Sequence, residues 1–194
     1  MSVRHLIGDP QVVSGTPMER DQDDRPAEWF RSVMAAHEGP LLRYAGRILG
    51  NVERARDVVQ ETFLRLLKSG RGPGDDHLAE WLFTVCRNRA LDVRRKERRM
   101  TQLGEHSEQA RLSAEPCPAA AAARREQVGQ VAAALGSLPA RQQEILRLKF
   151  QNGFSYKQIA GIMGLSVSNV GFLIHTGIQN LRRQFKAAGL LGGA

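Results

Sequence analysis

The chain has 194 residues, of which 42% are hydrophobic and only 6% are aromatic, and its formal net charge is +8. That length allows one large domain or two small ones. No apolar run approaches the roughly 20 residues that span a bilayer, and no apolar segment of a signal peptide begins the chain. We therefore expect a cytoplasmic protein without membrane insertion.

The basic excess is concentrated in two stretches. Residues 87–99 carry seven basic and two acidic side chains, and residues 139–186 carry seven basic and one acidic. Two separate basic patches indicate a polyanion that is contacted twice, most simply nucleic acid. A solvated surface with scattered arginine is the alternative interpretation.

Helical periodicity fills the first half of the chain, and no stretch there has a convincing strand pattern. Residues 27–37 predict a helix that ends at Gly39-Pro40, and residues 41–50 predict a second one. A third helix follows Asn51, which can cap it. Its expected apolar stripe comprises Ala55, Val59, Phe63, Leu66 and Leu67. The glycine-rich loop 69–76 precedes a long helix, whose expected core residues are Leu78, Trp81, Leu82, Val85 and Cys86. These elements predict a four-helix unit over about 25–97, in a domain spanning 27–99.

The remaining segments divide the chain further. Residues 1–26 form an arm rich in acidic residues, for which we expect disorder. Residues 100–123 mix proline, alanine and polar residues without a stable face and predict a linker. Order returns at about Arg124 with two amphipathic helices and a helix-turn-helix, giving a second four-helix unit of about 124–187 before the tail 188–194. The expected fold class is all-α, with two small helical domains joined by a flexible linker.

The stretch "SYKQIAGIMGLSVSNV", residues 155–170, has the pattern of a helix-turn-helix. Gly164 permits the sharp turn, and Ser166 can cap the second helix. The amino end of that helix would then point outward, where it can meet a phosphate or enter a major groove. A plain helical corner is the alternative.

Two other helix faces carry chemistry. On the helix from His77, we expect Phe83, Arg87, Arg94 and Arg98 to share a face away from the core, where an unstacked base and its phosphates could bind. Asn88 adds a group able to hydrogen-bond base edges. Alternatively, Phe83 belongs to the core and the arginines extend along the surface. Trp81 is assigned to the core.

The helix "DVVQETFLRLL" has a polar face with Asp57, Gln60 and Glu61 opposite its apolar stripe. An acidic face repels DNA, so in a basic protein it indicates a protein partner. A solvated helix face is the alternative.

These features, in this order, resemble the RNA polymerase sigma-70 family, specifically the extracytoplasmic-function (ECF) group. "RDVVQETFLRLL" is similar to the family's core-polymerase-binding helix. "AEWLFTVCRNRALDVRRKERR" is similar to its strand-opening and −10-element helix. "LPARQQEILRLKFQNGFSYKQIAGIMGLSVSNV" is similar to its −35-binding helix-turn-helix. The resemblance covers about residues 27–187.

The resemblance implies a promoter-specificity subunit that binds core RNA polymerase and promoter DNA, both duplex and melted. It also implies an anti-sigma factor, which commonly binds the free members of this group. Asp57, Gln60 and Glu61 would dock on the clamp helices of the polymerase's largest subunit. Arg87 and Asn88, with the loop 69–76, would hold flipped −10 bases. Nearby phosphates would be gripped by Arg94, Arg95, Arg98 and Arg99.

In the second unit, the resemblance implies that Ser166, Ser168 and Asn169 begin a −35 recognition helix, followed along the DNA by His175, Arg182 and Arg183. The sequence departs from the family's pattern at residues 171–174, which are Gly-Phe-Leu-Ile where a polar or basic cluster is usual. Ser168 and Asn169 would then read the bases with Phe172 on a thymine methyl, or DNA shape would be read instead.

No residue pattern indicates an enzyme, a cofactor or a metal site. The histidines are scattered, and the loop "GRGPGDD" lacks the Lys-Ser/Thr of a phosphate-binding loop. Cys86 and Cys117 do not suggest a structural disulfide. The competing hypothesis is a stand-alone helix-turn-helix regulator with an N-terminal sensing domain. A nucleic-acid enzyme using the arginine-rich helix is a third class, which lacks a catalytic constellation.

Overall fold

The computed structural model describes residues 25–101 and 122–187, which form helices and contain no strand. The first unit comprises α2 (Arg25–Leu49), α3 (Val52–Lys68) and α4 (Leu78–Thr101). The second comprises α5 (Ala122–Gly136), α6 (Ala140–Phe150), α7 (Tyr156–Met163) and α8 (Val167–Ala187). The all-α prediction is confirmed. Most of the predicted arm, nearly all of the predicted linker and the tail lie outside the described residues.

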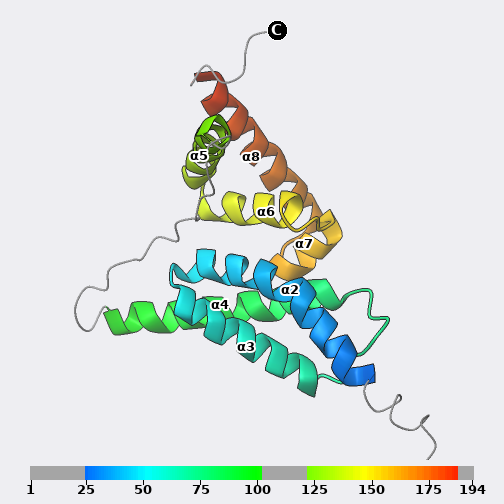
Figure 1. Cartoon of the computed structure of the whole chain (residues 1–194). Coiled ribbons are helices and arrows are strands. Elements are labelled where there is room, and N and C mark those ends of the chain that lie inside the picture. Colours follow the sequence, from blue (N-terminus) through cyan, green and yellow to red (C-terminus); the bar gives the residue numbers. More distant parts are fainter. Residues whose placement is uncertain (1–24, 102–121, 188–194) are drawn as a thin grey trace, which may run out of the picture.

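The first unit has three helices where the sequence predicted four. Gly39-Pro40 does not end a helix, because α2 continues through Pro40 to Leu49. Proline removes one backbone donor and crowds the carbonyl four residues earlier, which bends a helix without necessarily ending it. α2 changes direction along its length and wraps over α3 and α4 (Figure 1).

α3 begins and packs much as its sequence predicts. Asn51 caps it, its side chain accepting a hydrogen bond from the backbone N–H of Arg54 at 3.0 Å. Val59, Phe63 and Leu66 are buried in the core of the first unit. Leu67 is 60% exposed, so its placement in the apolar stripe was wrong. Leu67 is turned by roughly 100° from Leu66 around the helix axis, which takes it past the contact with α2 and α4.

The second unit contains the predicted helix-turn-helix. Ser155 and Gln158 form a capping box at the start of α7. Gly164 has a φ of 64° in the left-handed region, which glycine adopts without a Cβ penalty. The Ser166 hydroxyl then accepts from the Asn169 N–H at 3.2 Å, as predicted for the cap of α8. The two helices meet at a bend of 103°.

The two units pack against each other in the described part of the chain. α7 lies against α4, between the first unit and the rest of the second (Figure 1). The buried apolar side chains form one continuous cluster across this contact. No single described helix is long and apolar enough to cross a membrane, and α7 with α8 passes that test only as a pair bent at the 103° corner.

Candidate nucleic-acid interface

The outer face of α3 carries the three predicted polar residues. Asp57 and Gln60 are exposed, and Glu61 is half-buried. Asp57 has no ion-pair partner among the described residues, whereas Glu61 is bound by Arg65 at 2.9 Å and by Arg89 of α4 at 2.5 Å. Arg89 therefore fixes the Glu61 carboxylate on the surface and leaves Asp57 as the free negative charge of this face.

Two leucines extend the same face, and sequence reasoning missed both as surface residues. Leu64 is 55% exposed and Leu67 is 60% exposed. They follow Asp57, Gln60 and Glu61 at helical spacing, so they lie along one side of α3. Exposed large apolar side chains beside carboxylates suit a protein partner better than a nucleic acid. The available signal was that each leucine directly follows a buried residue, Phe63 or Leu66, and so is turned by about 100° from it.

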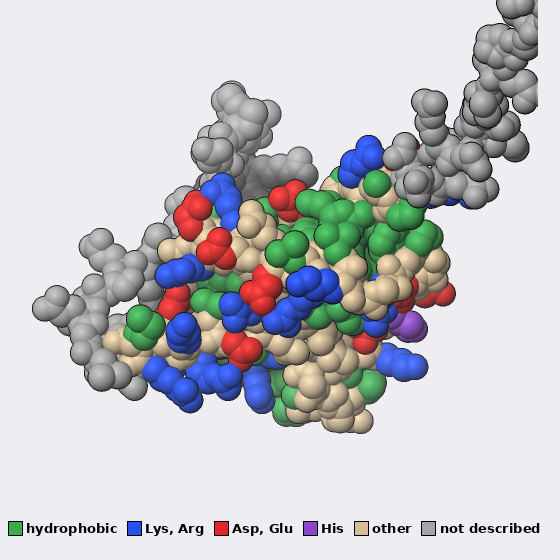
Figure 2. All heavy atoms as spheres, turned by 90° about the horizontal axis from the view of Figure 1, so that it is seen from below, with side chains coloured by type: hydrophobic (Ala, Val, Ile, Leu, Met, Phe, Trp, Pro, Cys, Tyr) green, Lys and Arg blue, Asp and Glu red, His purple; other side chains and the backbone are tan. Residues whose placement is uncertain are grey.

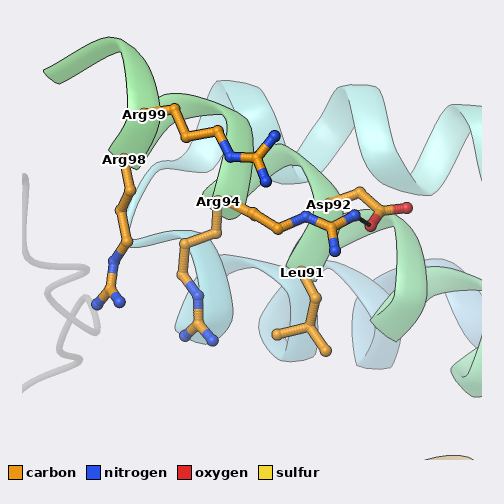
Figure 3. A pocket seen from close by; sticks show the side chains of 6 residues that line it. Leu91, Asp92, Arg94, Arg98 and Arg99 are labelled. Carbon is orange, nitrogen blue, oxygen red and sulfur yellow. Dashed lines mark hydrogen bonds and ion pairs between the residues drawn. The ribbon is translucent and has the colours of Figure 1, made fainter. Parts of the chain in front are cut away.

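The carboxyl end of α4 carries the predicted arginine cluster. Leu91, Asp92, Arg94, Arg95, Arg98 and Arg99 line an open hollow of about 370 Å³. Leu91, Arg94 and Arg98 point to the same side (Figure 3). Arg95 pairs with Asp92 at 2.7 Å, whereas no ion pair to a described residue engages the other three arginines. Lys and Arg side chains gather along the edge of the molecule where α4 ends (Figure 2).

The glycine-rich loop before α4 is ordered by one arginine. The Arg71 guanidinium binds Asp75 and lies 5.0 Å from the centre of the Trp81 ring. The hydrogen bond from Arg71, with one from the His77 backbone, lowers the pKa of Asp75. Trp81 is half-buried beneath Arg71, so it serves both the core and the shape of this loop.

The structure does not bring the predicted −10 residues into one open surface. Asn88 is exposed, as are most of the arginines toward the end of α4. Phe83 is only 2% exposed, and its ring centre lies 4.9 Å from that of Phe154. The alternative that Phe83 belongs to the core is confirmed, and the expectation that Arg87 faces away from the core was wrong, because the second unit covers that side of α4. Arg87 is 15% exposed and binds Glu144 of α6 at 2.7 Å.

The predicted −35 residues lie on the exposed side of α8 and its amino end. This set consists of Ser166, Ser168, Asn169, Phe172, His175, Arg182 and Arg183. Phe172 is 64% exposed, which is unusual for phenylalanine and leaves its ring free to contact a base edge or methyl group. His175 is 2.9 Å from the Gln179 amide, and Arg183 donates to the Asn180 side chain. The predicted −35 residues are therefore presented along one helix and its cap, whereas four of the seven basic residues of 139–186 lie on α6 and α7.

The described residues contain no group of three or more His, Cys, Asp or Glu side chains that could hold a metal ion. Cys86 is buried, and this burial raises the pKa of its thiol to about 12. A thiol with so high a pKa is almost entirely protonated at neutral pH and therefore unreactive.

Family models match both helical units. The model of sigma-70 region 2 matches residues 33–100, and that of sigma-70 region 4 matches residues 129–181. These matches coincide with α2–α4 and with most of α5–α8.

Named relatives and solved structures agree with these models. The chain is 31% identical over 166 residues to the ECF RNA polymerase sigma factor SigL of Mycobacterium tuberculosis, covering 84% of this chain and 93% of SigL. It is 38% identical over 134 residues to the ECF sigma factor EcfG of Rhodopseudomonas palustris, covering 68% of this chain and 71% of EcfG.

The fold is similar to that of the sigma factor RpoE from Bartonella quintana in its complex with the anti-sigma factor NepR. The TM-score is 0.65 at 23% identity, covering 81% of this chain and 96% of RpoE. CnrH in complex with the cytosolic domain of CnrY gives 0.55 at 24% identity, covering 81% and 88%. The chain therefore belongs to the sigma-70 family and to its extracytoplasmic-function group of sigma factors.

Proposed function

We propose that this ECF sigma factor divides its contacts among three surfaces. The polar face of α3 docks on core RNA polymerase, the arginine-rich end of α4 holds opened −10 DNA, and α8 holds the −35 duplex. As a member of the group, the chain directs RNA polymerase to promoters. The observation that carries the division is the separation of charge, with carboxylates and leucines on α3 and, on α4, an arginine cluster in which three members have no ion pair to a described residue.

The docking surface consists of Asp57, Gln60, Glu61, Leu64 and Leu67. Protein–protein interfaces combine an apolar centre with charged groups that set orientation and association rate. The two leucines supply apolar area, and Asp57 supplies a negative charge that no described residue neutralises through an ion pair. Arg89 holds Glu61 in place, so it acts as a positioning residue.

For opened DNA, we assign phosphate contacts to Arg94, Arg95, Arg98 and Arg99 and base contacts to Asn88, Phe83 and Arg87. Unpaired bases stack on aromatic rings, and guanidinium groups bind phosphates. Capture of unpaired bases favours the melted promoter by mass action, so strand opening needs no fuel. Phe83 and Arg87 can take part only when the second unit has left α4.

For the duplex, we assign Ser166, Ser168, Asn169, Phe172, His175, Arg182 and Arg183. Few of these residues form the bidentate pairs that discriminate bases strongly. Contacts of modest strength suffice when several tethered surfaces act together, because each module raises the local concentration of the others.

The docking assignment is tested by charge reversal. Asp57→Lys combined with Glu61→Lys should weaken binding to core polymerase by at least about tenfold, because like charges then face the partner. Glu53→Lys is the matched control, since Glu53 is also an exposed carboxylate of α3. Binding is measured by co-elution with purified core polymerase, and promoter-dependent transcription is measured beside it. Unchanged binding by the double variant would show that α3 does not dock there.

The stand-alone regulator is not favoured, because both sigma-70 regions are present rather than a sensing domain. We propose that the chain has no catalytic site of its own and works in the cytoplasm, where polymerase and promoters are found. RpoE is bound to the anti-sigma factor NepR in the solved complex named above, and we propose a partner of that kind here too.

A further inference from the structure

The face of α4 that we assign to unpaired bases is covered by the second unit. Phe83 is 2% exposed and makes an edge contact with Phe154, with 4.9 Å between ring centres. On its other side it lies 5.2 Å from the ring of Tyr44. No base can stack on a ring enclosed in this way. Base capture by Phe83 and the observed packing of the two units therefore exclude each other.

The Glu144 carboxylate of α6 links the second unit to the first. Glu144 Oε1 accepts a hydrogen bond from the Tyr44 hydroxyl at 2.7 Å and another from Arg87 Nε at 2.7 Å. The side chains of Arg87 and Glu144 are only 15% and 18% exposed. Burial opposes the charge on Arg87, but the hydrogen bond and attraction from Glu144 outweigh it and raise the pKa of the Arg87 guanidinium. We call Tyr44, Arg87 and Glu144 the Glu144 clasp.

The surroundings of the Glu144 clasp are otherwise basic. Arg147 of α6 is near Arg47 of α2, and burial together with the Arg47 charge lowers the pKa of Arg147 to about 10. The guanidinium groups of Arg87 and Arg147 therefore share the attraction of one carboxylate, with the Arg47 charge close to Arg147. Glu144 is also the one acidic residue in residues 139–186. Without its charge, the contact between the units would bring like charges together in a poorly hydrated place.

Gly161 of α7 lies at the contact with α4. A Cβ on Gly161 would lie 2.3 Å from Glu80 Oε1 of α4, so any side chain there would have to displace the Glu80 carboxylate. Gly161 is otherwise exposed, so a side chain there would disturb the contact between the units rather than the core of the second unit.

We propose that Glu144 is an autoinhibitory residue. Its carboxylate accepts the Arg87 hydrogen bond that a nucleic-acid group would otherwise accept, and it holds the two units together. The inference rests on the proposed function, in which Arg87 and Phe83 meet opened promoter DNA. Opened promoter DNA reaches Arg87 and Phe83 only in the open form, so closure lowers its apparent affinity by the fraction of molecules that are open. Glu144 and DNA compete for the same guanidinium.

The first experiment measures closure itself, without polymerase or DNA. Small-angle X-ray scattering is recorded for the full chain and for Glu144→Gln, which keeps the shape of the side chain and removes its charge. The radius of gyration should rise in the variant, because losing one partner of a half-buried pair shifts the closed-to-open equilibrium by at least about tenfold. Glu53→Gln, which removes an exposed carboxylate paired to Arg56, should leave the scattering unchanged.

The second experiment measures the competition. Binding of a mixed-sequence single-stranded DNA oligonucleotide to the full chain is followed by fluorescence anisotropy. Glu144→Gln should bind about tenfold more tightly than the wild type, in proportion to the opening, and Glu53→Gln should bind like the wild type. A variant that opens without any gain in DNA binding would show that closure does not inhibit, and would overturn the proposal.

A second pair of variants opens the contact at another place. Gly161→Glu puts a carboxylate against Glu80 and should raise the radius of gyration, whereas adding Glu80→Lys should restore closure by pairing the two charges. Circular dichroism checks that each variant keeps its helices. If Glu144→Gln and Gly161→Glu both scatter like the wild type, the Glu144 clasp does not hold the units together. If the wild type does not bind core polymerase, the proposed function is contradicted. The scattering result on closure of the two units would still hold in that case.

Discussion

At the scale of single residues, Tyr44 has the chemistry most altered by the contact between the two units. Burial, then the charge of Glu144 and its hydrogen bond, raise the pKa of the Tyr44 hydroxyl well above its ordinary value. The folded chain therefore keeps a proton that the unfolded chain releases near pH 10. The stability that Tyr44 contributes is fully present below that pH and is lost as the pH rises toward the folded pKa.

The chain's two tyrosines allow this effect to be isolated. Tyr44→Phe should fall less steeply in its free energy of unfolding above pH 10 than the wild type, because the titrating group is gone. Tyr156→Phe should keep the wild-type slope, since Tyr156 is 40% exposed and is not in the Glu144 clasp. Urea unfolding at a series of alkaline pH values measures both. Equal slopes for the two variants would contradict the burial of Tyr44.

We expect substitution of Arg147 to raise the free energy of unfolding. Its Nε is buried without a hydrogen-bond partner among the described residues, and the Arg47 charge is nearby. Arg147→Met should raise the free energy of unfolding by about 1 kcal/mol, because an unsatisfied buried polar group and a repulsion both disappear. Arg141→Met, at an exposed position of α6, should change it little. A loss of stability in Arg147→Met would mean that Glu144 needs this second arginine.

At the scale of elements, two glycines should respond to alanine in opposite directions. Gly164 has a φ of 64° at the corner between α7 and α8, so Gly164→Ala should cost about 1 kcal/mol. Gly129 lies inside α5 with open space around it, so Gly129→Ala should stabilise by roughly 0.5 to 1 kcal/mol. Thermal unfolding of both variants measures the difference. Equal shifts in Tm would argue against the left-handed corner.

The elements that could be predicted were those whose causes are local. Gly164 and the Ser166 cap specify the helix-turn-helix from a few neighbouring residues, and Asn51 specifies the start of α3. Pro40 misled because a proline can bend a helix or end it, and the sequence near Pro40 does not distinguish the two outcomes. Packing of α2 across both neighbouring helices decides in favour of one bent helix.

The candidate surfaces, like the helices, could be predicted only where their causes are local. The exposed arginines of α4 and the polar residues of α3 follow from helical periodicity alone. The burial of Phe83 could not follow from it, because the ring that covers Phe83 is Phe154, more than 70 residues later in the chain. The role of Glu144 left one trace in the sequence, its isolation among seven basic residues. Pairing it with Tyr44 and Arg87 needed the three-dimensional arrangement.

At the scale of the whole molecule, the described units form one packed body, and Glu144 is the acidic residue that the second unit contributes to their interface. Opening this interface would expose Phe83 and Arg87 of the −10 surface, whereas the −35 residues of α8 are exposed in the closed form as well. If polymerase binds the two units apart, its binding and the capture of DNA by Arg87 share one conformational equilibrium, and each partner should favour the other. This coupling explains why modest base contacts on α8 can suffice in the assembled complex.

In the proposed function, this chain holds promoter DNA as part of a complex with core polymerase. Footprinting on fragments selected by the complex is the test, with the chain alone, core polymerase alone and both together. Protection should appear at −35 and −10 only with both, and the Asp57→Lys, Glu61→Lys variant should lose it. Equally strong protection by the chain without polymerase would contradict the account.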